Sequence, residues 1–217
     1  MVADAGYGQN ADFRAGLTGR GIDYVVAVRS DITVHPHDAQ PRYRDKPSSV
    51  AALATSCGRQ AFTEVTWREG SRGPMRSRFL ALRVRPAGVR SRRLAQAAAT
   101  AEHGHWDGVL PEVTLLVEWP EQAEEPTDYW LVSLPEDTPL TELVRLAKIR
   151  WRIEHDYREL KHGLGLDHFE GRSWTGWHHH VTLVTAAQAF LTEQRLSPKA
   201  RTPASPSTRP STPSKTC

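Results

Sequence analysis

The chain has 217 residues, 39% of them hydrophobic, and a formal net charge of +3 at pH 7. This length allows one large domain, or one domain with an insertion. Cys57 and Cys217 are too few and too far apart for a disulfide framework or a cysteine zinc site. No apolar run approaches the roughly 20 residues that span a bilayer, and the start lacks the basic-then-apolar order of a signal peptide. We therefore expect a protein of the reducing cytoplasm.

The first 28 residues predict a strand, a helix and a second strand. Residues 2–4 are typical of the end of a strand. A short amphipathic helix follows, with Phe13 and Leu17 facing inward. Residues 22–28 form the continuous apolar run of a buried strand, so this order predicts a mixed or parallel sheet covered by helices. A fold that opens on the last residues of a core strand also leads us to expect a truncated N-terminus.

Residues 29–125 have a different character and predict a β-rich insertion. Alternating runs at 61–68, 76–85 and 113–119 are typical of strands. Between the last two runs lie several arginines and a His-Gly-His sequence at 103–105, which we expect to be flexible.

The C-terminal part predicts another strand and two helices. The strand covers 129–134. A long helix begins at Asp137 or Thr138 and ends near Gly163, and a second helix covers about 177–194. The remaining residues are rich in Ser, Thr, Pro and basic side chains. They cannot bury enough apolar area to fold, so we expect a disordered tail.

The most informative segment is the part of the long helix that carries Arg150, Glu154 and Lys161. At about 100° per residue, these side chains form one line along the flank of an apolar stripe. A carboxylate between two cations at the edge of a buried face suits a metal and phosphate site. An ordinary ion pair between Arg150 and Glu154, worth about 0.2–0.5 kcal/mol, is the alternative. The stripe consists of Leu146, Ile149, Ile153, Tyr157, Leu160 and Leu164.

Asp4 offers a second carboxylate for the same site. Converging carboxylates repel one another, and Mg²⁺ relieves this repulsion through oxygen ligands in near-octahedral geometry. Two such ions about 4 Å apart activate a water and stabilise the leaving 3′ oxygen of a phosphodiester. Arg150 and Lys161 would then bind phosphates through charge-assisted hydrogen bonds.

Other side chains have weaker signals. Trp130, on the strand before the helix, would stack on an unpaired base if it were exposed, worth about 1–3 kcal/mol; the alternative is a core tryptophan. Three consecutive histidines at 178–180 cannot chelate one ion from a helix, because they point about 100° apart. Two basic clusters suit a polyanion, with solvated faces as the alternative: Arg83, Arg85, Arg90, Arg92 and Arg93, and Arg145, Lys148, Arg150 and Arg152.

The spacing of Arg150, Glu154 and Lys161 resembles the Tyr-x2-Arg-x3-Glu-x6-Lys signature of bacterial insertion-sequence DDE transposases. The opening Val-Ala-Asp-Ala-Gly-Tyr-Gly resembles the strand that carries the second catalytic Asp of that family. Residues 165–172 and 177–180 are similar to the stretch that follows the catalytic helix in one branch of it. The resemblance covers about residues 1–196.

This resemblance implies an α/β fold of the RNase H-like type, a mixed sheet flanked by helices with a β-rich insertion. It implies that Asp4 and Glu154 are catalytic and bind Mg²⁺, or Mn²⁺ in its place. Arg150 and Lys161 would contact DNA phosphates, and Trp130 occupies the position of a base-stacking Trp. The implied partners are DNA, as element ends and target, and a second copy in the intact protein. The implied location is the bacterial nucleoid.

Two departures from the family pattern change the expected activity. The signature Tyr falls at Ala147, so that hydroxyl is missing. The first catalytic Asp of the family would precede Met1. We therefore expect the C-terminal part of a DDE transposase that is inactive alone. A non-catalytic DNA-binding remnant is the main alternative, and a metal-dependent nuclease unrelated to transposition is a third.

The expected organisation follows from these patterns and the resemblance. It comprises a partial RNase H-like core at 1–28, incomplete at the N-terminus, the β-rich insertion at 29–125, the C-terminal part of the catalytic core at 126–196, and a disordered tail at 197–217.

Overall fold

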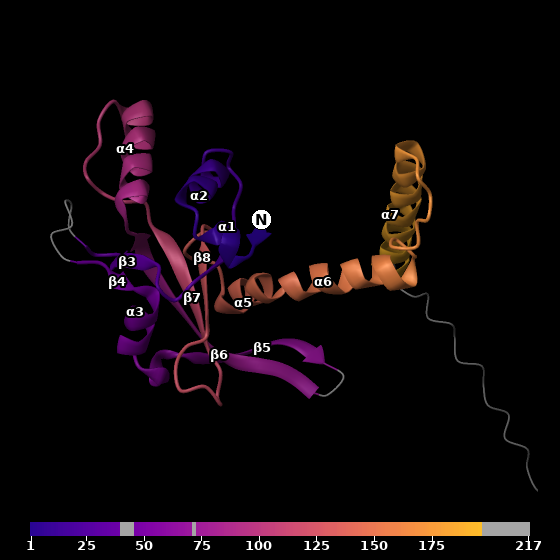
Figure 1. Ribbon diagram of the computed structural model, residues 1–217. Coiled ribbons are helices and arrows are strands. Elements are labelled where there is room, and N and C mark those ends of the chain that lie inside the picture. The colour runs from indigo at the N-terminus through magenta and orange to yellow at the C-terminus, as the bar shows by residue number, and fades with distance from the viewer. Residues whose placement is uncertain (40–45, 71–72, 197–217) are drawn as a thin grey trace, which may run out of the picture. The chain divides into compact units, whose positions relative to one another are not determined.

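The computed structural model describes residues 1–39, 46–70 and 73–196 (Figure 1). The chain separates into two compact units, Met1–Ile153 and Glu154–Cys217. We describe each unit by itself. No helix of the described residues is long and apolar enough to cross a membrane.

The first unit is built on an open mixed sheet with the strand order β1-β2-β8-β7-β6-β3-β4, and β5 pairs with β6 outside this path. β1 (Val2–Ala3) runs parallel to β2 (Val25–Val28), and the other ladders are antiparallel. The expected α/β class, a mixed sheet flanked by helices, is therefore confirmed. The remaining strands are β3 (Thr33–Pro36), β4 (Ser48–Ser49), β5 (Thr63–Gly70), β6 (Gly73–Pro86), β7 (Val113–Trp119) and β8 (Asp128–Val132).

Side chains at the helix N-termini explain where three helices of this unit begin. Asp4, Asn10 and Ser49 each accept hydrogen bonds from backbone N–H groups that have no partner within the helix. Leu17 is 7% exposed in the core and Phe13 packs against the same cluster, as the sequence predicts. The helices are α1 (Ala5–Gly8), α2 (Ala11–Thr18), α3 (Val50–Ser56), α4 (Val89–His103) and α5 (Leu140–Lys148), with a 3-10 turn at Arg59–Ala61.

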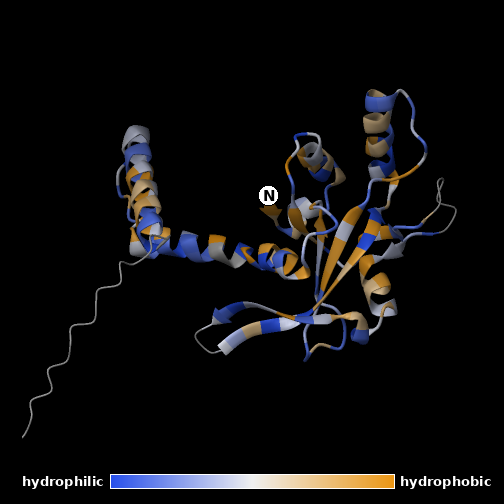
Figure 2. Cartoon of the chain, turned by 180° about the vertical axis from the view of Figure 1, so that it is seen from behind, coloured by the Kyte–Doolittle hydropathy of each residue, from blue (hydrophilic) through white to orange (hydrophobic). Residues whose placement is uncertain are grey.

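Apolar side chains cover both faces of the sheet. Successive residues of a strand point to opposite faces. Thus Val26 packs in a cluster with residues of α2 and α3, and Val25 packs in another with residues of α5. β7 is buried along its whole length. Figure 2 shows the apolar residues gathered on the central strands. The continuous apolar runs in the sequence reflect this burial on two faces.

The sequence analysis predicts no helix between the strands at 76–85 and 113–119, yet α4 covers the arginines there and ends at His103, whereas the expected flexibility of residues 103–105 stays a prediction. This segment contains strong helix formers such as Leu94 and Ala95. Only Ala95 of the helix is buried, so its sequence has little of the apolar periodicity that identifies a helix. Gly104 ends α4 with a φ of 76°, a left-handed conformation that glycine adopts without strain.

The long helix and the second helix are both confirmed, with shifted ends. α5 begins after Pro139 and ends at Lys148. α6 (Arg150–Arg158) follows after one residue and continues into a π-helical turn at Glu159–Gly163. α7 spans Trp174–Leu196. The expected tail at 197–217 lies outside the described residues. The strands of 29–125 share one sheet with β2 and β8, and the four-range organisation stays a prediction.

Candidate functional site

Asp4 lies directly after β1, where the chain enters α1. Its Oδ1 accepts hydrogen bonds from the backbone N–H groups of Gly6, at 3.0 Å, and Tyr7, at 3.4 Å. A Cβ on Gly8 would lie 1.9 Å from the carbonyl oxygen of Ala27 in β2, so only glycine allows α1 to approach the sheet this closely. The helix thus orients the Asp4 carboxylate through its cap and is itself held tightly against β2.

Arg150 meets Asp4 although the two residues lie at opposite ends of the first unit's sequence. Its Nη2 is 3.9 Å from Asp4 Oδ2, and both side chains are about half exposed, at 48% and 43%. An exposed pair at this distance contributes little to stability. The structure therefore brings together two residues of the predicted site, Asp4 and Arg150. Their contact contributes little to the free energy of unfolding.

A pocket of about 450 Å³ adjoins this pair. Tyr7 and Phe13 line it together with Asp4, Arg150 and Ile153. The two aromatic rings lie 5.6 Å apart, and Tyr7 is 61% exposed. Sequence reasoning missed both aromatic residues as parts of a site. The position of Tyr7 in the first turn after Asp4 was the available signal.

Glu154 and Lys161 belong to the second unit. Glu154 is exposed on α6. Lys161 lies in the π-helical turn, with its Nζ 4.6 Å from the centre of the Tyr157 ring. Within this turn the N–H of Leu164 donates to the Glu159 carbonyl at 3.0 Å, an i to i+5 bond. A π turn contains more residues than an α-helical turn. Lys161 therefore does not continue the line through Arg150 and Glu154 that a uniform α-helix predicts.

The predicted burial of the apolar stripe is wrong for α6. Ile153 is 60% exposed and Tyr157 is 53% exposed. The buried face belongs to α5 instead, where Leu143 and Val144 pack against the sheet. The apolar spacing continues from α5 into α6, but only the α5 residues are buried. Periodicity alone does not indicate at which residue the buried face of a helix ends.

Trp130 is 7% exposed and packs with Val25, Leu143 and Val144. In this structure Trp130 is therefore a core tryptophan, which was the alternative to a base-stacking role. Base stacking requires an open ring face, and that role stays a prediction. Ala147, which stands where the signature has Tyr, is 5% exposed in the same cluster. The small side chain of Ala147 is thus part of the apolar cluster between α5 and the sheet.

Many cations of the two basic clusters are paired with carboxylates. Arg90 donates to both carboxylate oxygens of Asp12. Arg145 Nε donates to Glu142 at 2.8 Å. These hydrogen bonds hold the pKa of Asp12 and that of Glu142 below their usual values. The clusters are therefore less positive than their sequences indicate.

A group of possible metal ligands that the sequence analysis did not single out lies in the second unit. Ligand atoms of His155, Asp156 and Glu159 fall within 4.8 Å of one another. Glu159 Oε2 accepts a hydrogen bond from Arg195 at 2.8 Å, which is the main cause of the lowered pKa of Glu159. Exposed groups of this kind are common without an ion. The i,i+4 spacing of His155 and Glu159 was the signal in the sequence.

The predicted non-metal role of the histidines at 178–180 stays a prediction, and one of them has a local structural bond. A ring nitrogen of His180, Nε2, is 2.9 Å from the carbonyl oxygen of Gly165. His180 also lies 5.4 Å from the ring of Phe169. These contacts join α7 to the segment before it.

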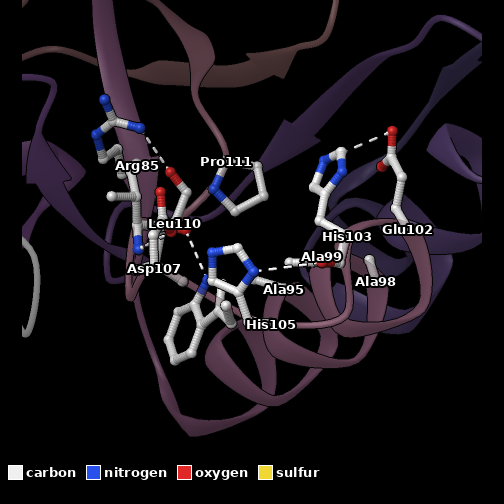
Figure 3. A pocket seen from close by; sticks show the side chains of 12 residues that line it. Arg85, Ala95, Ala98, Ala99, Glu102, His103, His105, Asp107, Leu110 and Pro111 are labelled. Atoms are coloured by element: carbon white, nitrogen blue, oxygen red, sulfur yellow. Dashed lines mark hydrogen bonds and ion pairs between the residues drawn. The ribbon is translucent and has the colours of Figure 1, made fainter.

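A second pocket of about 450 Å³ lies beside α4 (Figure 3). Two of its polar side chains, Arg85 and Trp106, bond to nearby backbone. Arg85 donates to the Leu110 carbonyl at 2.6 Å. Trp106 donates to the Val109 carbonyl at 2.9 Å. The residues that line this pocket include no member of the predicted site, so we place the candidate site at Asp4 and Arg150.

Comparison with known proteins gives one family match, at the N-terminal end of the chain. Residues 1–74 match the family described as DDE superfamily endonuclease. A search of curated proteins found no match to this chain. The matched residues include Asp4, Tyr7 and Phe13, which line the pocket of the candidate site, whereas Arg150 and Ile153 lie outside the match. The family match supports a transposase- or nuclease-like function. The N-terminal part of this chain is thus similar to a DDE superfamily endonuclease.

Proposed function

We propose that the chain is the C-terminal part of a DDE transposase of the insertion-sequence type, which cuts DNA at element ends and joins the 3′ hydroxyl to a target. The observation that carries the proposal is the contact between Asp4 and Arg150 at 3.9 Å. It joins the segment that matches the endonuclease family to the helix with the Arg-x3-Glu-x6-Lys spacing.

Asp4 and Glu154 would hold the divalent metal, Mg²⁺ or Mn²⁺, because carboxylate oxygens are the ligands that such hard cations prefer. Asp4 fits this role, since the cap bonds to Oδ1 orient the carboxylate and leave Oδ2 on the side of Arg150. A metal held there would supply Lewis-acid chemistry, which activates a water and stabilises the leaving oxygen of a phosphodiester.

The chain's own cations would position the DNA. Arg150 would donate to a phosphate beside the metal ligands, and the forked guanidinium suits this because it donates two parallel hydrogen bonds. Lys161 would hold a flanking phosphate as a point charge. Trp130 would contribute base stacking only if its ring became uncovered. In the intact protein we propose a homodimer that works on DNA in the bacterial nucleoid.

We propose that this chain alone does not transfer strands. The resemblance implies three metal-binding carboxylates, and only Asp4 and Glu154 match family positions. The test is a Mg²⁺- or Mn²⁺-dependent cleavage assay on DNA that carries the element ends. Robust cutting that Glu154→Gln abolishes would contradict the proposed inactivity.

DNA binding tests the role of Arg150. Each phosphate contact contributes about one unit to the slope of log affinity against log salt. Arg150→Ala is expected to weaken binding and to reduce that slope by about one unit. Arg29→Ala is the matched control, because Arg29 is also exposed and paired with an aspartate, at 2.7 Å, but does not line the pocket. Equal effects of the two variants would contradict a site at Arg150.

A non-catalytic DNA-binding remnant is the second candidate. The exposed side chains of Arg92 and Arg93 on α4 favour it, because they offer cations away from the candidate metal ligands. A non-catalytic remnant predicts a salt-dependent affinity for DNA that is the same in the wild type and in Asp4→Asn. A transposase site predicts that Mg²⁺ strengthens DNA binding and that Asp4→Asn abolishes this gain.

A further inference from the structure

Lys148, the last residue of α5, carries its charge into the interior of the first unit. Its Nζ donates a hydrogen bond to Oε2 of Glu118 in β7. The side chains of Lys148 and Glu118 are only 22% and 6% exposed. Lys148 therefore differs from Arg145 and Arg150 of its sequence cluster, whose side chains are 56% and 48% exposed, because it is not available to a polyanion.

Three aromatic rings surround the Lys148 ammonium. The distances from Nζ to the ring centres are 5.2 Å for Trp67, 5.8 Å for Phe79 and 5.3 Å for Trp130. These rings come from β5, β6 and β8, and a cation this close to a ring face is attracted by the ring's electrons. Together with Glu118, four strands of the sheet hold one charged group at the end of α5.

A bulge in β5 provides one of the rings. The register between β5 and β6 shifts between Thr66 and Arg68, so that Trp67 is the extra residue. Bulges redirect a side chain relative to the regular strand. The Trp67 ring meets Phe79 edge to face at 5.7 Å and faces Lys148. The irregularity is thus located where it completes the enclosure of the ammonium.

The enclosed charge lies two residues before Arg150. Ile149 is the only residue between α5 and α6 and keeps a right-handed helical conformation, with φ −67° and ψ −18°. So short a link leaves little freedom between α5 and residues 150–153, the part of α6 that belongs to the first unit. A buried ion pair loses much of its attraction to desolvation, so its best-attested use is to specify one arrangement.

We infer that Lys148, Glu118 and the three rings position the start of α6, so that Arg150 lies beside Asp4. Lys148 and Glu118 are positioning residues, which act through Arg150 and contact no phosphate. The consequence for DNA rests on the proposed function, whereas the placement of residues 150–153 does not depend on it.

The test uses the double variant Glu118→Gln/Lys148→Met, which leaves the net charge of the chain unchanged. Apolar replacements of a buried pair often keep a protein folded. DNA affinity is expected to fall about tenfold, which corresponds to the loss of one charged hydrogen bond. In an Arg150→Ala background the same double change is expected to have no further effect, because residues that act through one another are not additive. Lys148→Arg is expected to retain affinity.

Arg29→Met/Asp31→Asn is the matched control, because it also removes a charge pair without changing the net charge. It is expected to leave DNA affinity unchanged in both backgrounds. An additive loss from Glu118→Gln/Lys148→Met in the Arg150→Ala background would overturn the inference. So would unchanged affinity in the otherwise wild-type chain.

Amide hydrogen exchange tests the placement without DNA. The double variant is expected to speed exchange at residues 150–153 and to leave the amides of β7 protected. Trp67→Leu keeps the Lys148–Glu118 pair but removes one ring beside the ammonium, and it is also expected to speed exchange at residues 150–153. This variant replaces the double variant in the test if the double variant does not fold. Unchanged exchange at 150–153 would overturn the inference. If the wild-type chain binds no DNA but the variants still show faster exchange at residues 150–153, the inferred placement is supported. The lack of DNA binding would then contradict the proposed function.

Discussion

At the scale of single residues, Gly8 has the tightest surroundings near Asp4. A Cβ there would lie 1.9 Å from the Ala27 carbonyl oxygen and 3.1 Å from Val26 Cβ. Gly8→Ala is expected to force α1 away from β2 and to lower the free energy of unfolding by about 1–3 kcal/mol. Urea unfolding measures this change.

Gly16→Ala is the control for Gly8. A Cβ at Gly16 meets only the end of the Arg20 side chain, at 3.2 Å. This replacement is expected to stabilise α2 by about 0.5–1 kcal/mol. Equal effects at the two glycines would show that the contact between α1 and β2 is not tight.

Tyr7 is the exposed aromatic residue of the candidate site. If its ring stacks on an unpaired base, Tyr7→Ala is expected to weaken binding of single-stranded DNA by about 1–3 kcal/mol. Tyr7→Phe is expected to retain the affinity, because stacking needs the ring and not the hydroxyl. Val89→Ala removes another exposed apolar side chain, which does not line the pocket, and serves as the control. A loss of the same size in Tyr7→Phe would exclude stacking.

At the scale of helices and strands, we expect the pairing of α2 with α4 through Arg90 and Asp12 to depend on pH. Arg90 lowers the pKa of Asp12 through its hydrogen bonds. A carboxyl group with a lowered pKa in the folded state stabilises the protein above its unfolded pKa, about 4, and loses this effect as the pH falls through the folded value. Arg90→Gln is therefore expected to be less stable than the wild type at pH 7 and equally stable at pH 2. Urea unfolding at both pH values decides; a constant difference would contradict the ion pair.

α5 packs too closely to accept the Tyr of the signature. Ala147 is 5% exposed beside Val144 and Trp130. Ala147→Tyr is expected to overpack this cluster and to cost about 1–3 kcal/mol of stability. Ala101→Tyr, at an exposed position of α4, is the control for introducing the same side chain. Unchanged stability of Ala147→Tyr in a thermal scan would show that the cluster can open.

Helices and strands can be predicted from the sequence where their buried faces produce a recognisable pattern of apolar residues. β2 is predicted from its continuous apolar run and α5 from apolar residues that recur at helix spacing. α4 was missed because it buries only Ala95. The site was predicted only in part: Asp4 and Arg150 do meet, but the enclosure of Lys148 depends on contacts among β5, β6, β7 and β8. Such contacts are set by tertiary register, which local patterns do not contain.

At the scale of the whole molecule, the first unit contains all eight strands of the described sheet and both large apolar clusters. A fragment of residues 1–153 is therefore expected to fold by itself. Its circular dichroism melting curve should show one cooperative transition near that of the full chain. A broad melt without cooperativity would show that the second unit is needed for folding.

The enclosure of Lys148 also makes the start of α6 visible to optical spectroscopy. Two of the seven tryptophans in the chain, Trp67 and Trp130, place their indole rings beside the ammonium. A charge that leaves two indoles changes their emission, so movement of Lys148 would alter the intrinsic fluorescence without any attached dye. The protein thus contains its own reporter for the position of Arg150.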